Sequence, residues 1–248
     1  MTSHIAIAVI ADVHGNLPAL EAVVEDIGRR GIDAAINLGD HASGPLWPGE
    51  TVALLMRQSW VQIAGNCDRQ VVHQAPADHG DSDRFAFERL SAAQREWLAA
   101  LPATAPVLDQ ILAFHGTPSD DEAYLLEAVD SGRVRLARAA EIEQRLTGAP
   151  GRVMLCGHSH IPRIVRHNDR LIINPGSVGL PAYTHDRPEA HVMETGLPDA
   201  RYAVIERLSR GWQAQLVAVP YDHHAAAEQA RRNGRPDWEF ALRTGYAR

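Results

Sequence analysis

The sequence predicts an α/β fold, because five short apolar segments alternate along the chain with segments of helical spacing. Residues 5–11 form a continuous apolar run, which is typical of a strand buried on both faces. Similar segments lie at 33–40, 60–68, 110–116 and 152–160. Apolar residues recur with helical spacing at 17–30, with Asn16 as the expected N-cap, and a second helix is expected at 50–58. We therefore expect an α/β core over most of residues 1–160.

The remaining segments are expected to complete the same domain. Residues 69–109 form a helical elaboration, with an amphipathic helix pair at 85–101 beside the sheet. Short apolar runs with Gly or Asn-Asp turns at 163–179 and 200–221 predict antiparallel hairpins, and residues 223–234 predict a closing helix. Because no fixed-period repeat or Pro/Ser-rich linker divides the chain, we prefer one domain over residues 1–248 to two.

Composition excludes several classes of protein. The chain has 24 Lys and Arg against 31 Asp and Glu, a formal charge of -7, so no broad nucleic-acid-binding surface is expected. Two cysteines are too few for a disulfide scaffold, and the N-terminus lacks the pattern of a signal peptide. No apolar stretch approaches the roughly 20 residues that cross a bilayer. We expect a cytoplasmic protein that does not contact a membrane.

Polar side chains recur where each of the five apolar segments ends, and this recurrence is the strongest functional signal. The residues are Asp12, His14, Asp40, Asn66, Asp68, His115, His158 and His160. Each motif alone is weak, since Asp-x-His is more often a cap or surface pair and Gly-Asp is most often a turn. In open α/β sheets, however, ligands bind at the carboxyl ends of the strands.

The residue types at these positions favour metal binding. In an extended backbone, His158 and His160 would direct both rings to one side while Ser159 points away. Imidazole, carboxylate and amide ligands without thiolates suit Mn²⁺, Fe²⁺ or Zn²⁺ better than Ca²⁺. Without Asp68, the strand-end residues offer seven ligands. If one of them bridges two ions, the seven fill two sites of four ligands each and leave open positions for water and substrate, as in hydrolytic dinuclear centres.

Six motifs give the chain a family resemblance. They are "DVHGN" at 12–16, "GDHASGP" at 39–45, "GNCD" at 65–68, "HG" at 115–116, "GHSH" at 157–160 and "NPGSVG" at 174–179. In this order they resemble the calcineurin-like metallophosphoesterases, and within them the small bacterial and archaeal phosphodiesterase-like group. The resemblance implies a four-layer α/β/β/α sandwich of two mixed sheets flanked by helices.

The same resemblance implies a function and a ligand set. One divalent ion would bind Asp12, His14 and His160, the other Asn66, His115 and His158, and Asp40 would bridge both. Mn²⁺ is the first expectation for the two ions, with Fe²⁺, Zn²⁺, Ni²⁺ and Mg²⁺ as alternatives. A water or hydroxide held between the ions would attack the phosphorus of a small-molecule phosphoester, with no protein nucleophile.

Four further residues are candidates around this centre. Asp68 is expected to accept a hydrogen bond from a ligand imidazole, or else to stabilise a turn. Arg69 would contact a substrate phosphate or be a solvated surface arginine. His41 would line the pocket without binding metal. Cys67 stands where many members of the wider superfamily have a histidine that protonates the leaving oxygen, so it is either a weak substitute acid or a small residue that shapes the pocket.

Alternative functions stay open from the sequence alone. Relatives of the fold include dinucleoside polyphosphate hydrolases and phosphoprotein phosphatases, and some proteins on this fold are non-catalytic scaffolds. Scaffold proteins tend to lose metal ligands, whereas all seven candidates are present here. A homo-oligomer is a further expectation, with "WEFAL" at 238–242 either as a subunit contact or as a helix face packed on its own domain.

Overall fold

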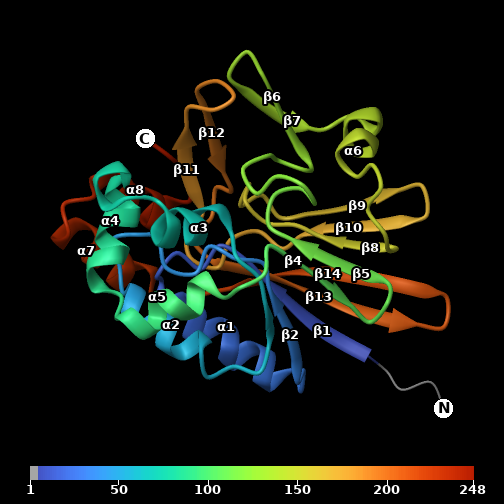
Figure 1. Ribbon diagram of the computed structural model, residues 1–248, viewed down its shortest axis with the longest axis horizontal. Coiled ribbons are helices and arrows are strands. Elements are labelled where there is room, and N and C mark those ends of the chain that lie inside the picture. The colour runs from blue at the N-terminus through green and yellow to red at the C-terminus, as the bar shows by residue number, and fades with distance from the viewer. Residues whose placement is uncertain (1–4) are drawn as a thin grey trace.

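Two five-stranded mixed sheets form the centre of the molecule. The computed structural model describes residues 5–248. The first sheet has the order β14 (Gly211–Val219), β13 (Ala200–Leu208), β1 (Ile5–Ile10), β2 (Ala34–Asn37) and β3 (Val61–Gln62). The second has the order β4 (Thr104–Val107), β5 (Ile111–Phe114), β8 (Val153–Leu155), β10 (Arg170–Asn174) and β9 (Arg163–His167). Figure 1 shows the two sheets lying against each other.

The strands that carry the predicted site run parallel within each sheet. β1, β2 and β3 pair in parallel in the first sheet, and β5 pairs in parallel with β8 in the second. Alternate residues of β1 belong to two hydrophobic cores. Ile7 and Val9 pack between the two sheets, whereas Ala8 and Ile10 pack on the opposite face of the first sheet, under the helices. The continuous apolar run therefore reflects burial of this strand on both faces, as predicted.

Helices cover the outer faces of both sheets. Leu20, Val23 and Ile27 of α1 (Leu17–Arg29) pack on the first sheet together with α2 (Pro48–Leu55). The side chain of Asn16 accepts a hydrogen bond from the Ala19 amide, so it caps α1 as predicted. On the second sheet, α6 (Ala139–Arg145) provides the cover through Ile142. Helix, sheet, sheet and helix form four layers, which confirms the expected architecture (Figure 1).

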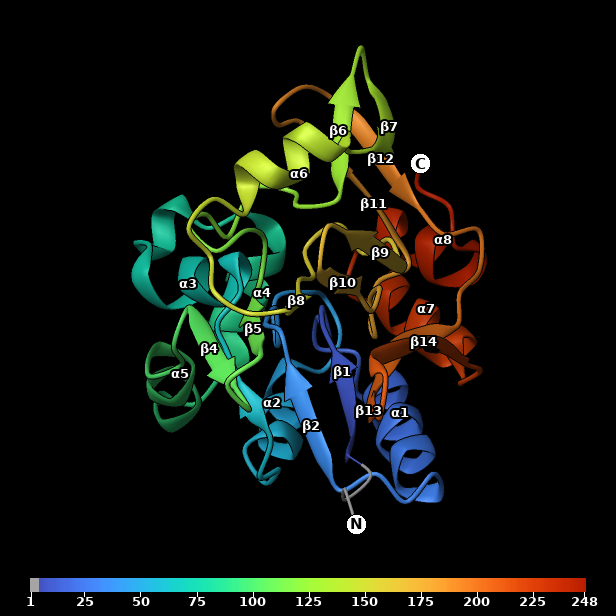
Figure 2. The ribbon, with the colours of Figure 1, turned by 90° about the vertical axis from the view of Figure 1, so that its right-hand side faces the viewer.

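Two further helical groups flank the carboxyl ends of the strands. The first consists of α3 (Asn66–His73), a 3₁₀ turn at Pro76–Asp78, α4 (Asp81–Arg89) and α5 (Ala92–Ala99). The second consists of α7 (His223–Arg232) and α8 (Pro236–Thr244). Figure 2 places these groups on opposite sides of β1 and β2. The α4–α5 pair matches the predicted helix pair, but the expected helical elaboration at 69–109 also contains β4, an edge strand of the second sheet.

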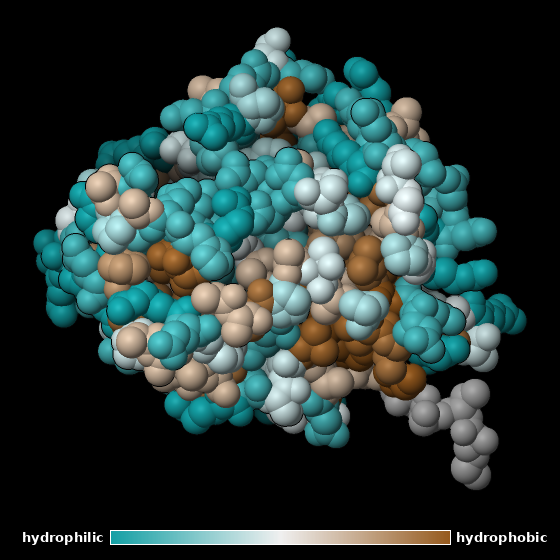
Figure 3. Space-filling view, in the orientation of Figure 1, coloured by the Kyte–Doolittle hydropathy of each residue, from teal (hydrophilic) through white to brown (hydrophobic). Residues whose placement is uncertain are grey.

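Two small hairpins complete the fold. β6 (Glu127–Asp130) pairs with β7 (Arg133–Leu136), and β11 (Ala182–His185) pairs with β12 (His191–Glu194). Both stand above the sheets in Figure 1, and neither was predicted from the sequence. The hairpins β9–β10 and β13–β14 were predicted. In Figure 3, hydrophobic residues gather mainly over the two sheets, whereas the surrounding helices and hairpins are mostly hydrophilic.

The structure also bears on two other expectations, which concern membrane-spanning segments and the "WEFAL" segment. Among residues 5–248, no helix is long and apolar enough to cross a membrane. Trp238, Ala241 and Leu242 of α8 are buried against Leu46 and Leu180, so the "WEFAL" segment packs on its own chain. The first four residues of the expected 1–248 domain lie outside the described part.

Candidate metal centre

The carboxyl ends of strands from both sheets meet at one place, and the predicted residues gather there. Backbone hydrogen bonds join the loops after β1 and β2, since the amides of Asp12 and His14 donate to the carbonyls of Gly39 and Asp40 at 3.0 and 2.9 Å. The amide of Gly157 after β8 donates to the carbonyl of His115 after β5. Rigid backbone contacts thus fix the loops from which the candidate ligands project.

Five of the seven predicted ligands have left-handed backbone. Residues Asp12, His14, Asp40, His158 and His160 have φ between 50° and 67°, and only four other non-glycine residues in the described chain share a positive φ. This conformation costs about 1–2 kcal/mol per residue for L-amino acids. The expectation that His158 and His160 lie in an extended strand was therefore wrong. Such strained backbone concentrates at functional sites, where the surrounding structure holds it in place.

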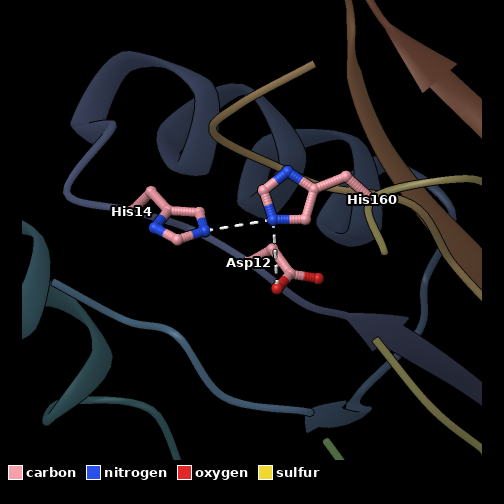
Figure 4. Close-up of side chains that lie close together, drawn as sticks. All are labelled: Asp12, His14 and His160. Atoms are coloured by element: carbon pink, nitrogen blue, oxygen red, sulfur yellow. Dashed lines mark hydrogen bonds and ion pairs between the residues drawn. The ribbon is translucent and has the colours of Figure 1, made fainter. Parts of the chain in front are cut away.

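The first cluster consists of Asp12, His14 and His160 (Figure 4). Nδ1 of His14 donates to the carbonyl of Ser43 at 2.7 Å, and Nδ1 of His160 donates to that of Leu180 at 2.7 Å. Because a neutral imidazole carries one N–H, each Nε2 then presents a lone pair. The two Nε2 atoms nevertheless lie 3.1 Å apart, and that of His160 lies 3.4 Å from Oδ1 of Asp12.

The second cluster consists of Asp12, Asp40 and His115. Nδ1 of His115 donates to the carbonyl of Leu38 at 2.8 Å, so in the neutral ring the lone pair is on Nε2. That Nε2 lies 3.4 Å from Oδ2 of Asp40 and 3.8 Å from Oδ1 of Asp12. Oδ2 of Asp40 also lies 3.8 Å from Nε2 of His14. This oxygen therefore faces both clusters, as a bridging ligand must.

Asn66 and His158 border the second cluster. Nε2 of His158 donates to the backbone carbonyl of Glu122 at 2.9 Å, so its lone pair is on Nδ1. The rings of His158 and His115 lie 5.2 Å apart. Oδ1 of Asn66 is buried without a hydrogen-bond partner among the described residues, as are Oδ1 of Asp12 and Nε2 of His115. Buried acceptors without partners are rare in folded proteins.

The electrostatics of the clusters favour a positive charge. Burial opposes ionisation of Asp40, but the imidazoles of His115 and His14 outweigh it and hold its pKa well below the ordinary value. Burial likewise disfavours a charged His115, but Asp40 and Asp12 overcome this and raise its pKa to about 10. Burial and His115 lower the pKa of His158 to about 3, and burial and His160 lower the pKa of His14. The metal-free chain therefore presents ionised carboxylates beside a protonated His115 and the neutral imidazoles of His14 and His158.

Divalent metal ions fit this donor set. A cation would supply the partner that the three orphaned atoms lack and would offset the repulsion between the facing Nε2 lone pairs of His14 and His160. Imidazole Nδ1–H groups donating to backbone carbonyls are the usual support for metal-binding histidines. Nitrogen and oxygen donors with one neighbouring thiol are typical of transition-metal sites rather than calcium sites.

The structure agrees with the second of the two roles expected for Asp68, support of a turn, and corrects the prediction for His41. Asp68 does accept from an imidazole, but it is the Nδ1 of His41, at 2.7 Å, and not that of a predicted ligand. Its carboxylate also accepts from the backbone amides of Asp40 and Gly65 at 2.8 and 2.9 Å, so it holds the loop of Asp40 in place. His41 is fully buried against Trp97 and does not line the cavity.

Arg69 is a partly exposed surface arginine, close to the second of its two expected roles, but it is paired with acidic residues rather than free in solvent. Its guanidinium forms two hydrogen bonds to Asp121, at 2.7 and 2.8 Å, and one to Glu122 at 3.0 Å. Arg69 is not among the residues that line the cavity. It therefore secures the loop whose Glu122 carbonyl accepts from His158, rather than presenting a free cation to a phosphate.

Cys67 does line the cavity, as expected of a residue that shapes the pocket. Its Sγ lies within 4.8 Å of candidate ligand atoms of His14 and Asp40, and its amide donates to Oδ1 of Asp40 at 2.9 Å. Burial, reinforced by the charge of Asp40, raises the pKa of the thiol well above its ordinary value. A thiol with such a raised pKa is a poor proton donor to the leaving oxygen of a substrate.

A cavity of about 670 Å³ opens onto the candidate ligands His14, Asp40, Asn66, His158 and His160. Its wall also contains residues that the sequence analysis missed, among them Asp83, Tyr183, Arg187, Trp238 and Arg248. These residues come from α4, from the β11–β12 hairpin, from α8 and from the segment that follows α8, none of which carries a motif. Only the three-dimensional fold brings them to the strand ends.

A four-layer α/β sandwich with carboxylates and imidazoles clustered in a cavity wall defines a metal-dependent hydrolase. The family model of the calcineurin-like phosphoesterase superfamily domain matches residues 5–196. The chain belongs to this superfamily and is a metal-dependent phosphoric ester hydrolase.

Similar proteins occur in bacteria and archaea. An uncharacterized protein of Methanocaldococcus jannaschii is 26% identical over 265 residues, with 94% of each chain covered. The crystal structure of a metallophosphoesterase from Sphaerobacter thermophilus is 25% identical, covers 97% of this chain and 99% of its own, and has a TM-score of 0.77. A hypothetical protein of Pyrococcus horikoshii OT3, 18% identical with 98% of each chain covered and a TM-score of 0.71, shares the fold.

Proposed function

We propose that the chain is a dinuclear-metal phosphodiesterase that acts on a small phosphodiester or nucleotide-derived substrate. One ion would be held by Asp12, His14 and His160, and the other by Asn66, His115 and His158, with Asp40 between them. The observation that carries the proposal is the 3.1 Å approach of two Nε2 atoms whose Nδ1 atoms both donate to backbone carbonyls. Without a cation between or beside them, these lone pairs would repel each other.

The two ions supply Lewis acidity toward phosphoryl oxygens and lower the pKa of water when they are bound. The chain's own residues provide the geometry. Asp68 and the Cys67 amide hold the Asp40 loop and carboxylate, and the carbonyls of Ser43, Leu38 and Leu180 fix three imidazole tautomers. Such fixed donors reduce the reorganisation needed during reaction. Mn²⁺ is the proposed metal, because the donors are imidazole nitrogens and carboxylate or amide oxygens.

The cavity supports a small substrate. A volume of about 670 Å³ is in the range of sites for drug-sized ligands and nucleotides. Tyr183 and Trp238 provide aromatic surface, and the exposed Arg187 and Arg248 provide positive charge along the same cavity. The free thiols of Cys67 and Cys156 fit a reducing compartment, and we propose the cytoplasm.

Hydrolysis of bis(4-nitrophenyl) phosphate and of the corresponding monoester tests the proposal. Metal-stripped protein would be assayed with Mn²⁺, Mg²⁺, Zn²⁺ or no metal. We expect Mn²⁺-dependent cleavage of the diester, and a loss of at least about 100-fold in Asp40→Asn and Asn66→Ala, because each removes a ligand atom. Asp33→Asn is the matched control, because Asp33 is an exposed carboxylate just before β2, and this variant should retain activity.

The alternatives give different results. Preferential cleavage of the monoester would contradict the diesterase assignment and favour a phosphomonoesterase. The other outcome is that neither substrate is hydrolysed with any metal, although an unfolding transition shows that the protein is folded. This result would contradict catalysis and favour a scaffold role.

A further inference from the structure

Asp83 of α4 is a carboxyl group in the cavity wall that the proposed centre does not use. Its Oδ1 accepts a hydrogen bond of 2.6 Å from the hydroxyl of Ser43. The backbone carbonyl of Ser43 in turn accepts from Nδ1 of His14 at 2.7 Å. Ser43 therefore connects the Asp83 carboxyl to His14, a candidate metal ligand, although Asp83 itself does not belong to the ligand set.

Two other acidic groups of the cavity wall are paired with arginines. Glu122 pairs with Arg69 at 3.0 Å and Asp237 with Arg235 at 2.6 Å. The hydroxyl of Tyr183 donates to the carbonyl of His158 at 2.9 Å. Among residues 5–248, no group donates a hydrogen bond to Oδ2 of Asp83, so this oxygen is free to carry and deliver a proton.

The surroundings of Asp83 suit a proton donor. Burial raises the pKa of the Asp83 carboxyl, and the negative charges of Asp40 and Asp68 raise it further. The hydrogen bond from Ser43 and the nearby His79 lower this pKa, but the net shift is upward. Exposed carboxyls such as Asp81, on the same helix, lack this burial. A carboxyl that keeps its proton closer to neutral pH is the usual general acid of hydrolases that work there.

We propose that Asp83 is the general acid that protonates the leaving oxygen during phosphoester cleavage, an inference that rests on the proposed function. In this step the oxygen of the attacking water bonds to phosphorus, and the bond from phosphorus to the leaving oxygen breaks. The electron pair of that bond goes to the leaving oxygen, which takes the proton from the Asp83 carboxyl. The resulting carboxylate regains a proton from solvent, which balances the proton released by the attacking water.

The test compares leaving groups. Methyl aryl phosphodiesters, from 2,4-dinitrophenyl to phenyl, would be cleaved by the Mn²⁺-loaded wild type and by Asp83→Asn. Asparagine keeps an acceptor for Ser43 but has no proton to give. We expect the phenyl ester to slow by about 100-fold or more and the dinitrophenyl ester by less than about threefold, because a good leaving group needs no acid. Glu88→Gln on the exposed face of α4 is the matched control and should match the wild type.

A positioning role gives another pattern. If Asp83 only held Ser43 and thereby His14, then Asp83→Asn and Ser43→Ala would slow all esters by the same factor and weaken Mn²⁺ binding in a titration. That result, or wild-type rates in Asp83→Asn for every ester, would overturn the inference while leaving the proposed function intact. A wild type inactive on the whole series would instead remove the proposed function itself.

Discussion

Gly65 allows the loop of Asp40 and the start of α3 to approach each other. A Cβ at this position would lie 2.1 Å from Oδ1 of Asp40 and 2.6 Å from its backbone nitrogen. We predict that Gly65→Ala displaces the bridging carboxylate and lowers the free energy of unfolding by about 1–3 kcal/mol, as overpacking usually does. Urea unfolding would measure the stability, and cleavage of bis(4-nitrophenyl) phosphate would measure the accompanying loss of activity.

Gly28 provides the opposite case within the same protein. It lies inside α1, and a Cβ there would meet nothing within 4 Å. Gly28→Ala should therefore stabilise the protein by about 0.4–1 kcal/mol with unchanged activity. If both alanine variants destabilised equally, close packing around Asp40 would not be the cause.

The candidate ligands were predictable as residue types, because strand ends are marked by an abrupt change from apolar to polar residues. Their backbone was not, since His158 and His160 follow a buried strand and only their positive φ values reveal the turn. The partners of Asp68 and Arg69 were also misjudged. An Asp or Arg beside a motif does not indicate which of the neighbouring groups, His41 or Asp121, will be within reach.

Helix α3 and the loop at 117–124 act together through Arg69. The guanidinium joins Asp121 and Glu122, and the Glu122 carbonyl fixes the tautomer of His158. We predict that Arg69→Ala weakens binding of the second Mn²⁺ ion by up to about tenfold, the lower end of the effect of a residue that supports a ligand. Calorimetric titration of metal-stripped protein would measure the two binding steps.

A matched control is available on α7. Arg231 pairs with Glu228 at 2.7 Å on an exposed helix surface away from the clusters. Arg231→Ala removes a comparable ion pair and should leave both binding steps unchanged. Equal weakening in the two variants would mean that general loss of surface charge, rather than the loop contact, controls the affinity.

The elements divide into those with strong local patterns and those without. The helix α1 was predicted from its apolar spacing and its Asn16 cap, and the hairpin β13–β14 from short apolar runs separated by a Gly turn. The hairpins β6–β7 and β11–β12 were missed because their strands are four residues long and half of the residues are polar, so they form no apolar run. The two hairpins also contact each other through β7 and β12, and such tertiary contact leaves no local signal in the sequence.

The division into two sheets is a property of the whole chain. β1 pairs with β13, about 200 residues away, and the polar ends of β1, β2 and β3 meet those of β5 and β8 only because the sheets stack face to face. The sequence alone predicted the α/β class and the shared site. The two-sheet arrangement followed from the family resemblance, because strand pairing at such separation leaves no local signal.

Bound metal should stabilise the entire fold, because its ligands come from both sheets and have no common site in the unfolded chain. Mn²⁺ at 100 times its Kd is expected to raise the free energy of unfolding by about 2.7 kcal/mol per independent site. The shift in melting temperature on adding Mn²⁺ to metal-stripped protein would measure this. Asp40→Asn should show a much smaller shift.

The size of this stabilisation should depend on pH through His115. In the metal-free protein its pKa is about 10, above the value of about 6.5 in an unfolded chain, so the protonated ring contributes stability that is complete below pH 6.5 and is lost as pH rises through 10. Metal binds the neutral ring, and a proton must leave first. Between pH 6 and 8 the Mn²⁺-induced stabilisation should therefore increase by about 1.4 kcal/mol per pH unit. A Mn²⁺-induced shift of the same size at both pH values would show that His115 releases no proton when metal binds, and would contradict either its raised pKa or its place in the ligand set.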